Sequence, residues 1–230
     1  MDRRTLLFGA GALAACAHTT SSQRQEINDF LHRAMDAIGG EEALRRARVM
    51  EWTAGEATYV RGRLSIEWDV RVVVEPFVYA RLENWLWFDD TPASIVEINE
   101  GRGWLISDNG RSLLTPGETA HYRDEFAVFG LMRLVPLSDG NSGYSVSHLS
   151  EGADETRLFI EHPRAAPTTL TFDAQARIRR AEYDDDRRIE FSGNIEGGGV
   201  RWPSQMLFYR RNRIDRAASI RDPLITRQQR

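Results

Sequence analysis

The longest regular pattern in the chain is an alternation of apolar and polar side chains between residues 64 and 75. Its apolar positions are Leu64, Ile66, Trp68, Val70, Val72 and Val74. A period of two predicts a strand with one buried and one mostly solvated face. Residues 49–60 and 77–88 are further long strand candidates. Long strands joined by tight turns indicate a curled antiparallel sheet or an open barrel.

A helical period precedes these strands. Apolar side chains recur at steps of three and four residues between Ile27 and Ile38, and Gly39-Gly40 ends the pattern. A short second helix is predicted from Glu41 to about Ala47. Residues 118–134 predict a third helix, with Phe126 and Phe129 on one side. This third helix is either a lid over a cavity or simply a packed helix.

The rest of the chain predicts shorter strands. They fall at residues 95–99, 103–107, 144–150, 155–161, 168–172, 178–183, 188–191, 205–211 and 214–220. So many strands without helices between them exclude a doubly wound α/β sheet. We therefore expect a mainly β (α+β) fold in one domain over residues 26–222, followed by a polar tail at 223–230.

The first residues resemble an export signal. A basic start, Met1-Asp2-Arg3-Arg4, precedes an apolar run from Thr5 to Ala15. Eleven helical residues extend about 16 Å, roughly half of a bilayer core, so this run is too short to span a membrane. Residues 1–15 are expected to be removed. Because Arg3-Arg4 also resembles the twin-arginine pattern, the export route stays open.

Cys16 is the only cysteine of the chain. Leu13-Ala14-Ala15-Cys16 resembles the bacterial lipobox, which implies cleavage before Cys16, acylation of that residue and an anchor in a membrane. Ala17 stands where an inner-membrane retention signal would have aspartate. An outer-membrane lipoprotein facing the periplasm is therefore favoured over inner-membrane retention. Residues 16–25 are expected to form a lipidated flexible tether.

Composition removes several function classes. All 30 basic residues are arginine, which excludes a phosphate-binding or Schiff-base lysine. The net charge of −4 argues against a nucleic-acid partner. None of the five histidines has a metal-binding spacing such as H-x-H or H-E-x-x-H. We predict no metal, no cofactor, no catalytic residue and no enzymatic activity, although a hydrolase with a site assembled in space remains an alternative.

Several segments carry a resemblance to a known family. They are Ala37-Ile38-Gly39-Gly40-Glu41-Glu42-Ala43-Leu44, Gly55-Glu56-Ala57, Asn99-Glu100-Gly101-Arg102-Gly103-Trp104, Leu170-Thr171-Phe172-Asp173, Ile189-Glu190-Phe191-Ser192 and Gly199-Val200-Arg201-Trp202-Pro203. In this order they resemble the LolA/LolB-like family of outer-membrane lipoprotein-sorting carriers. The resemblance implies an incomplete antiparallel barrel, or half-barrel, wrapped around a few helices, with an apolar concave cavity. It transfers no individual ligand-binding residue.

The candidate ligand-binding residues come from the apolar strand faces and the third helix. They are Leu64, Ile66, Trp68, Val70, Val72, Trp85, Trp87, Phe126 and Phe129. The tryptophans of segment 77–88 suit a cavity mouth or a membrane contact, because indole is amphipathic. The expected function is binding of an acyl chain, a lipid or a lipidated protein, in lipid or lipoprotein transport or localisation. The alternative is a non-catalytic envelope scaffold with a filled core and an envelope protein as partner.

Overall fold

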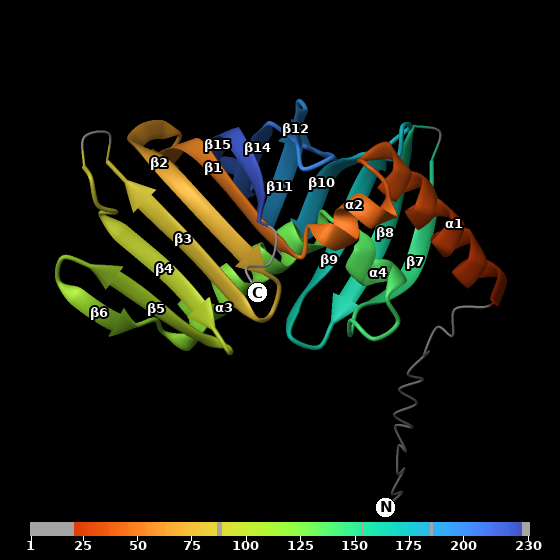
Figure 1. Ribbon diagram of the computed structural model, residues 1–230, viewed down its shortest axis with the longest axis horizontal. Coiled ribbons are helices and arrows are strands. Elements are labelled where there is room, and N and C mark those ends of the chain that lie inside the picture. Colours follow the sequence, from red (N-terminus) through yellow and green to blue (C-terminus); the bar gives the residue numbers. More distant parts are fainter. Residues whose placement is uncertain (1–20, 87–88, 153, 185, 227–230) are drawn as a thin grey trace, which may run out of the picture.

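The computed structural model describes residues 21–86, 89–152, 154–184 and 186–226 (Figure 1). The helices are α1 (Ser21–Ala37), α2 (Glu41–Arg46), α3 (Pro116–Leu131) and α4 (Val135–Ser138). The first strands are β1 (Val49–Val60), β2 (Arg63–Glu75), β3 (Tyr79–Trp85), β4 (Ser94–Asn99), β5 (Arg102–Ser107) and β6 (Gly110–Leu113). After α4 come β7 (Ser145–Glu151), β8 (Glu155–His162), β9 (Ala165–Asp173), β10 (Ile178–Tyr183) and β11 (Arg187–Ser192). The last strands are β12 (Ile195–Gly197), β13 (Val200–Trp202), β14 (Gln205–Arg210) and β15 (Arg213–Thr226).

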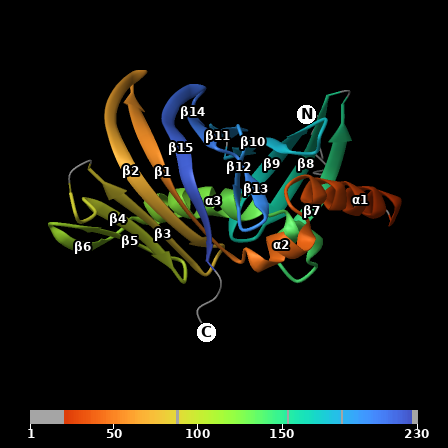
Figure 2. The ribbon, with the colours of Figure 1, turned by 45° about the horizontal axis from the view of Figure 1, so that its top comes forward.

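Thirteen of the described strands form one antiparallel sheet, in the order β6-β5-β4-β3-β2-β1-β15-β14-β11-β10-β9-β8-β7. Strands β6 and β7 are its two edges, so the sheet is curved but open (Figures 1 and 2). The pairing of β1 with β15 joins the two halves of the sheet. Register shifts within several of the pairs, as between Thr53 and Ala54, increase the local twist and curvature. The fold is an open half-barrel with a few helices, as the sequence predicts.

Helix α3 crosses the strands on one face of the sheet, which we call the inner face (Figure 2). It contacts β2, β4 and β5 in one half of the sheet and β9 and β10 in the other. The predicted alternation of β2 holds where the strand is covered, because Val70, Val72 and Val74 are all buried. Helices α1, α2 and α4 pack against one another, and α1 also contacts the edge strand β7. The apolar core lies between these helices and the inner face.

The outer face of the same strands is polar and is held by ion pairs. Arg71 on β2 contacts Glu51 and Glu83 on the two neighbouring strands, at 2.5 and 3.8 Å. Arg81 on β3 contacts Glu83 and Glu97, at 2.6 and 3.3 Å. Opposite charges on adjacent strands offset one another across this face, where Glu51 and Glu83 are themselves buried. The inner face of the sheet therefore packs against the helices, whereas the outer face carries these charged side chains.

Several boundaries differ from the predicted ones. Helix α3 runs from Pro116 to Leu131 rather than over residues 118–134, and the Thr115 cap sets its earlier start. Helix α1 begins at Ser21, so residues 21–25 belong to a helix and not to the tether; Ser22 donates to Glu26 and Gln25 to Asp29, one helical turn on. Strand β15 continues to Thr226 by pairing with the start of β1, so the polar tail cannot begin at residue 223. Strand β3 begins only at Tyr79 because Phe77 has a left-handed backbone, with φ of 61°, in the preceding turn.

Four short elements have no counterpart among the predicted elements, namely β6, α4, β12 and β13. Each spans only three or four residues, too short for a periodic pattern to stand out. Residues 1–20, which include Cys16, the predicted signal and the first half of the predicted tether, lie outside the described residues, as does Trp87. No helix within the described ranges is both long and apolar enough to cross a membrane.

Candidate ligand cavity between helix α3 and the sheet

Helix α3 starts in solvent and ends in the core. Thr115 caps it: its hydroxyl oxygen accepts from the Glu118 backbone N–H at 3.2 Å, while the Glu118 carboxylate accepts from the Thr115 N–H at 2.9 Å. This capping box fixes the point at which the helix starts. From Glu125 to Leu131 every residue of α3 is buried. The second half of the helix is therefore an interior element.

Aromatic contacts fix α3 on the inner face. The ring of Phe129 meets the indole of Trp52 edge to face, with centroids 4.9 Å apart. Phe129 also approaches Phe208 on β14 at 6.3 Å and Phe126 at 6.3 Å. Such pairs stabilise by about 0.5–1.5 kcal/mol beyond the area they bury. Together they form an apolar layer that joins β1, β14 and α3.

A buried ion cluster interrupts this apolar layer. Arg216 on β15 donates to Glu125 on α3 at 2.5 Å and to Glu56 on β1 at 3.4 Å. The side chains of Glu56 and Glu125 are 8% and 3% exposed, so both carboxylates are removed from water. The guanidinium also lies over the ring of Phe208, 4.2 Å from its centroid. This one cation thus links the helix to both halves of the sheet.

Burial dominates the electrostatics of this cluster. Desolvation raises the pKa of Glu56, although the charge of Arg216 opposes the shift. Burial alone would lower the pKa of Arg216, but Glu125 and Glu56 outweigh it and that pKa lies well above its usual value. The pKa of Tyr122 is raised, again mainly by burial. Arg216 is therefore permanently charged, whereas burial favours the protonated form of Glu56.

Three small cavities lie along the inner face. The inner cavity, of about 10 Å³, lies among Val70, Val72, Phe126, Phe129 and the ion cluster. The middle cavity, of about 20 Å³, is lined by Met50, Trp52, Met132, Trp202, Met206 and Ile220 among others. The mouth cavity, of about 40 Å³, lies between the end of α1 and the β12–β13 hairpin. Since one water needs roughly 10–15 Å³, the present conformation holds little more than single waters at the inner end.

The structure brings four of the predicted ligand-binding residues together. Val70, Val72, Phe126 and Phe129 all line the inner cavity. Trp68 is partly buried against the core, and Ile66 is half-buried further along the same strand. Helix α3 is a packed helix whose aromatic side chains form one wall of this cavity.

Two of the other predicted residues lie elsewhere. Leu64 is 55% exposed because it pairs with Tyr59 near the tip of the β1–β2 hairpin, beyond the packed part of the sheet, so it does not line the cavity. Trp85 lies opposite Asp69, on the other face of the sheet from Val70.

Sequence reasoning missed the charged members of the site. Glu56, Glu125 and Arg216 each sit at an inward-facing position of an otherwise apolar pattern. A charge at such a position is a signal for a buried pair, because an isolated charge would be too costly to bury. The signal does not name the partner, since the three residues lie on three separate elements.

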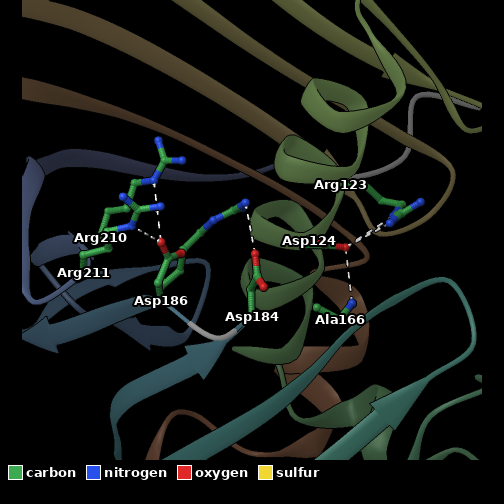
Figure 3. A network of polar contacts seen from close by, with 8 residues as sticks. Arg123, Asp124, Ala166, Asp184, Asp186, Arg210 and Arg211 are labelled. Carbon is green, nitrogen blue, oxygen red and sulfur yellow. Dashed lines mark hydrogen bonds and ion pairs between the residues drawn. The ribbon is translucent and has the colours of Figure 1, made fainter.

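A second set of polar contacts holds the middle of α3 and the β10–β11 turn (Figure 3). Asp124 accepts from the Ala166 backbone N–H at 3.3 Å, which ties α3 to β9, and pairs with Arg123 at 3.2 Å. Asp186 contacts the Arg211 guanidinium at 3.1 Å. These acidic groups are neutralised by nearby arginines. The described residues contain no group of three or more histidine, cysteine or acidic side chains arranged to hold a metal ion.

Comparison with known proteins gives a consistent result for the fold. No protein-family model matches the chain, and no curated protein matches it in sequence. Among solved structures, a LolA superfamily protein from Nitrosomonas europaea superposes with a TM-score of 0.55 at 9% identity, covering 86% of this chain and 93% of its own. The protein has a LolA-like fold.

Two further structures extend this LolA-like group. A domain from Vibrio parahaemolyticus assigned to outer membrane lipoprotein sorting superposes with a TM-score of 0.55 at 10% identity, covering 85% of this chain and 92% of its own. A DUF1329 family protein from Desulfovibrio piger gives a TM-score of 0.53 at 10% identity, with coverages of 84% and 90%. At such low identity the shared property is the fold.

Proposed function

We propose that this protein is a lipid-anchored, non-enzymatic protein of the bacterial cell envelope that binds a hydrophobic ligand between α3 and the inner face of the sheet. The ligand is an acyl chain, free or attached to a lipid or lipoprotein. The observation that carries the proposal is the apolar wall formed by Val70, Val72, Phe126 and Phe129 around the inner cavity. Burying an acyl chain there would gain about 25 cal/mol per Å² of apolar surface.

The LolA-like fold supports this proposal, because the Vibrio parahaemolyticus domain with the same fold is assigned to lipoprotein sorting. The small cavity volumes mean that a ligand must displace side chains or shift α3. No chemical energy source is needed for such a step, since a ligand favours the open state by its own binding free energy. The role is reversible burial of the chain.

Whole protein purified under native conditions tests this proposal through mass spectrometry of extracted lipid. We expect a stoichiometric acyl ligand that is lost in Val70→Asp, which puts a charge on the cavity wall. Val73→Asp is the matched control, because Val73 belongs to the same strand but its side chain points to the outer face. Val70→Thr keeps the side-chain shape and serves if Val70→Asp fails to fold. An empty protein that takes up no labelled fatty acid would refute ligand binding.

A scaffold with a filled core is the second candidate function. The volume of about 10 Å³ at the inner cavity favours it, as does the clamp of Arg216 on Glu125. A scaffold needs no ligand. This hypothesis predicts that an envelope protein binds the outer face and can be crosslinked to it. Recovery of such a partner together with a ligand-free protein would support it.

The anchor is a separate part of the proposal. Leu13-Ala14-Ala15-Cys16 supports acylation at Cys16 and a place in the outer membrane facing the periplasm. Cell fractionation tests it: Cys16→Ser is expected to leave the protein out of the outer-membrane fraction. Recovery of the Cys16→Ser protein in that fraction, in the same amount as the unaltered protein, would contradict lipid anchoring.

A further inference from the structure

The three cavities of the inner face adjoin one another in series. The mouth cavity and the middle cavity share Met132 and Trp202 in their linings. The middle cavity and the inner cavity share Trp52 and Met206. The series therefore runs from the surface beside the β12–β13 hairpin to the buried ion cluster, a single row of small spaces along the sheet.

Methionine side chains lie at both junctions. Met132 lines both the mouth and the middle cavity, and Met206 lines both the middle and the inner cavity. A methionine side chain is unbranched and has three rotatable bonds, so it adopts alternative packings easily. Rotation of these two side chains would join the spaces into one narrow apolar tract.

The mouth of this tract is basic. Arg177, Arg179 and Arg201 line it, and no acidic side chain does. Arg177 is paired with Asp173 at 3.0 Å, and Arg201 approaches Glu196 at 3.5 Å. Arg179 is exposed, and it makes no ion pair with any residue that the structure describes. The mouth thus presents positive charge beside an apolar floor formed by Ile38, Ile178 and Phe191.

A second, independent feature lies in the same lining. Trp202 is 7% exposed, and its indole N–H is buried without a hydrogen-bond partner in the described structure. A buried donor without an acceptor is unfavourable, so such a group in a native protein needs an explanation. An oxygen atom of a ligand held between the hairpin and Met132 would provide the acceptor.

We propose that the mouth cavity binds the anionic head group, carboxylate or phosphate, of a single-chain lipid whose alkyl chain follows the methionine-lined tract toward the inner cavity. Arg179 and Arg201 attract the charge, and the Trp202 N–H donates to a head-group oxygen. This inference rests on the proposed function for the alkyl chain. It adds that the ligand is anionic and that its alkyl chain enters through the mouth cavity.

Competition binding to the whole protein tests the head-group site. The assay measures how well each of three ligands with the same saturated chain displaces a fluorescent acyl probe. The ligands are a fatty acid, a lysophosphatidic acid and a neutral monoacylglycerol. We expect both anionic ligands to bind about tenfold more tightly than the glyceride. Tighter binding of the fatty acid would indicate a carboxylate head group, and tighter binding of the lysophosphatidic acid would indicate a phosphate.

Variants assign this preference to residues. Arg179→Gln and Arg201→Gln are each expected to weaken the anionic ligands about fivefold and to leave the glyceride unchanged. Trp202→Phe, which removes the N–H and keeps an aromatic ring, is expected to act in the same direction. Arg63→Gln is the matched control, because Arg63 is exposed at the start of β2 and lines none of the three cavities.

The outcomes separate the two proposals. Equal binding of charged and neutral ligands, unaffected by Arg179→Gln, would overturn the head-group site and leave acyl binding intact. An equal loss of affinity for the anionic ligands in Arg63→Gln would also overturn the head-group site, because the effect would then reflect the overall charge of the protein. If none of the three ligands displaces the probe, the proposed acyl-binding function fails as well.

Discussion

Glu125 on α3 and Arg216 on β15 are separated by 91 positions in sequence, yet Nη2 of the arginine lies 2.5 Å from the carboxylate. Glu56 on β1 completes the cluster from the neighbouring strand. One buried guanidinium therefore fixes the helix to the centre of the open sheet, where the first and last strands meet.

Removal of the cation is expected to be costly. Arg216→Met leaves two buried carboxylates without a counter-charge and should lower the free energy of unfolding by about 3–5 kcal/mol. Arg46→Met is the control, because its pair with Glu42 is exposed, and we expect a loss of at most about 0.5 kcal/mol. Urea unfolding measures both. Equal losses would show that the buried cluster contributes no more than a surface pair.

The stability should depend on the protonation of Glu56. Burial raises the folded-state pKa of Glu56 above its ordinary value of 4.5, so the folded protein retains a proton that the unfolded chain releases. The number of bound protons is then larger in the folded state, and stability falls as pH rises from about 4.5 through the raised pKa. Glu56→Gln cannot ionise and should lose this decline. Unfolding curves across this range check the prediction, and an unchanged pH slope in Glu56→Gln would contradict it.

Two glycines of α3 should respond oppositely to alanine. A Cβ on Gly130 would overlap the ring of Pro76 in the β2–β3 turn, whereas a Cβ on Gly117 would meet no atom within 4 Å. Helix propensity favours alanine at both positions by up to about 1 kcal/mol. We expect Gly130→Ala to destabilise by about 1–3 kcal/mol and Gly117→Ala to be neutral or stabilising. Thermal melting of the two variants compares them, and a stabilised Gly130→Ala would show that the turn yields easily.

The aromatic layer should carry much of the stability of the site. Phe129 is 3% exposed and contacts both Trp52 and Phe208. Phe129→Ala is expected to cost about 3–5 kcal/mol through lost burial and a residual cavity. Leu113→Ala, at a side chain 62% exposed, should change stability by less than about 0.5 kcal/mol. A small loss in Phe129→Ala, accompanied by uptake of a labelled acyl chain, would instead mean that ligand occupies the space.

The strand and helix patterns could be predicted because each depends on neighbours along the chain. The alternation from Leu64 to Val74 specifies a strand and its apolar face whatever lies against it. It does not specify where that face is covered, which is why Val70 lines the cavity and Leu64 is exposed near the hairpin tip. Burial depends on how far α3 reaches across the sheet.

The amino-acid sequence by itself determined a mainly β chain with long antiparallel strands, an initial helix ended by Gly39-Gly40, and the existence of the aromatic helix α3, though not its ends. These features follow from local periodicity and backbone preference. Only the tertiary structure decided that Glu56, Glu125 and Arg216 meet, and that Trp202 and the mouth arginines share one cavity. The reason is physical: a buried charge or donor is compensated by groups distant in sequence, and only the folded sheet determines which of them come within reach.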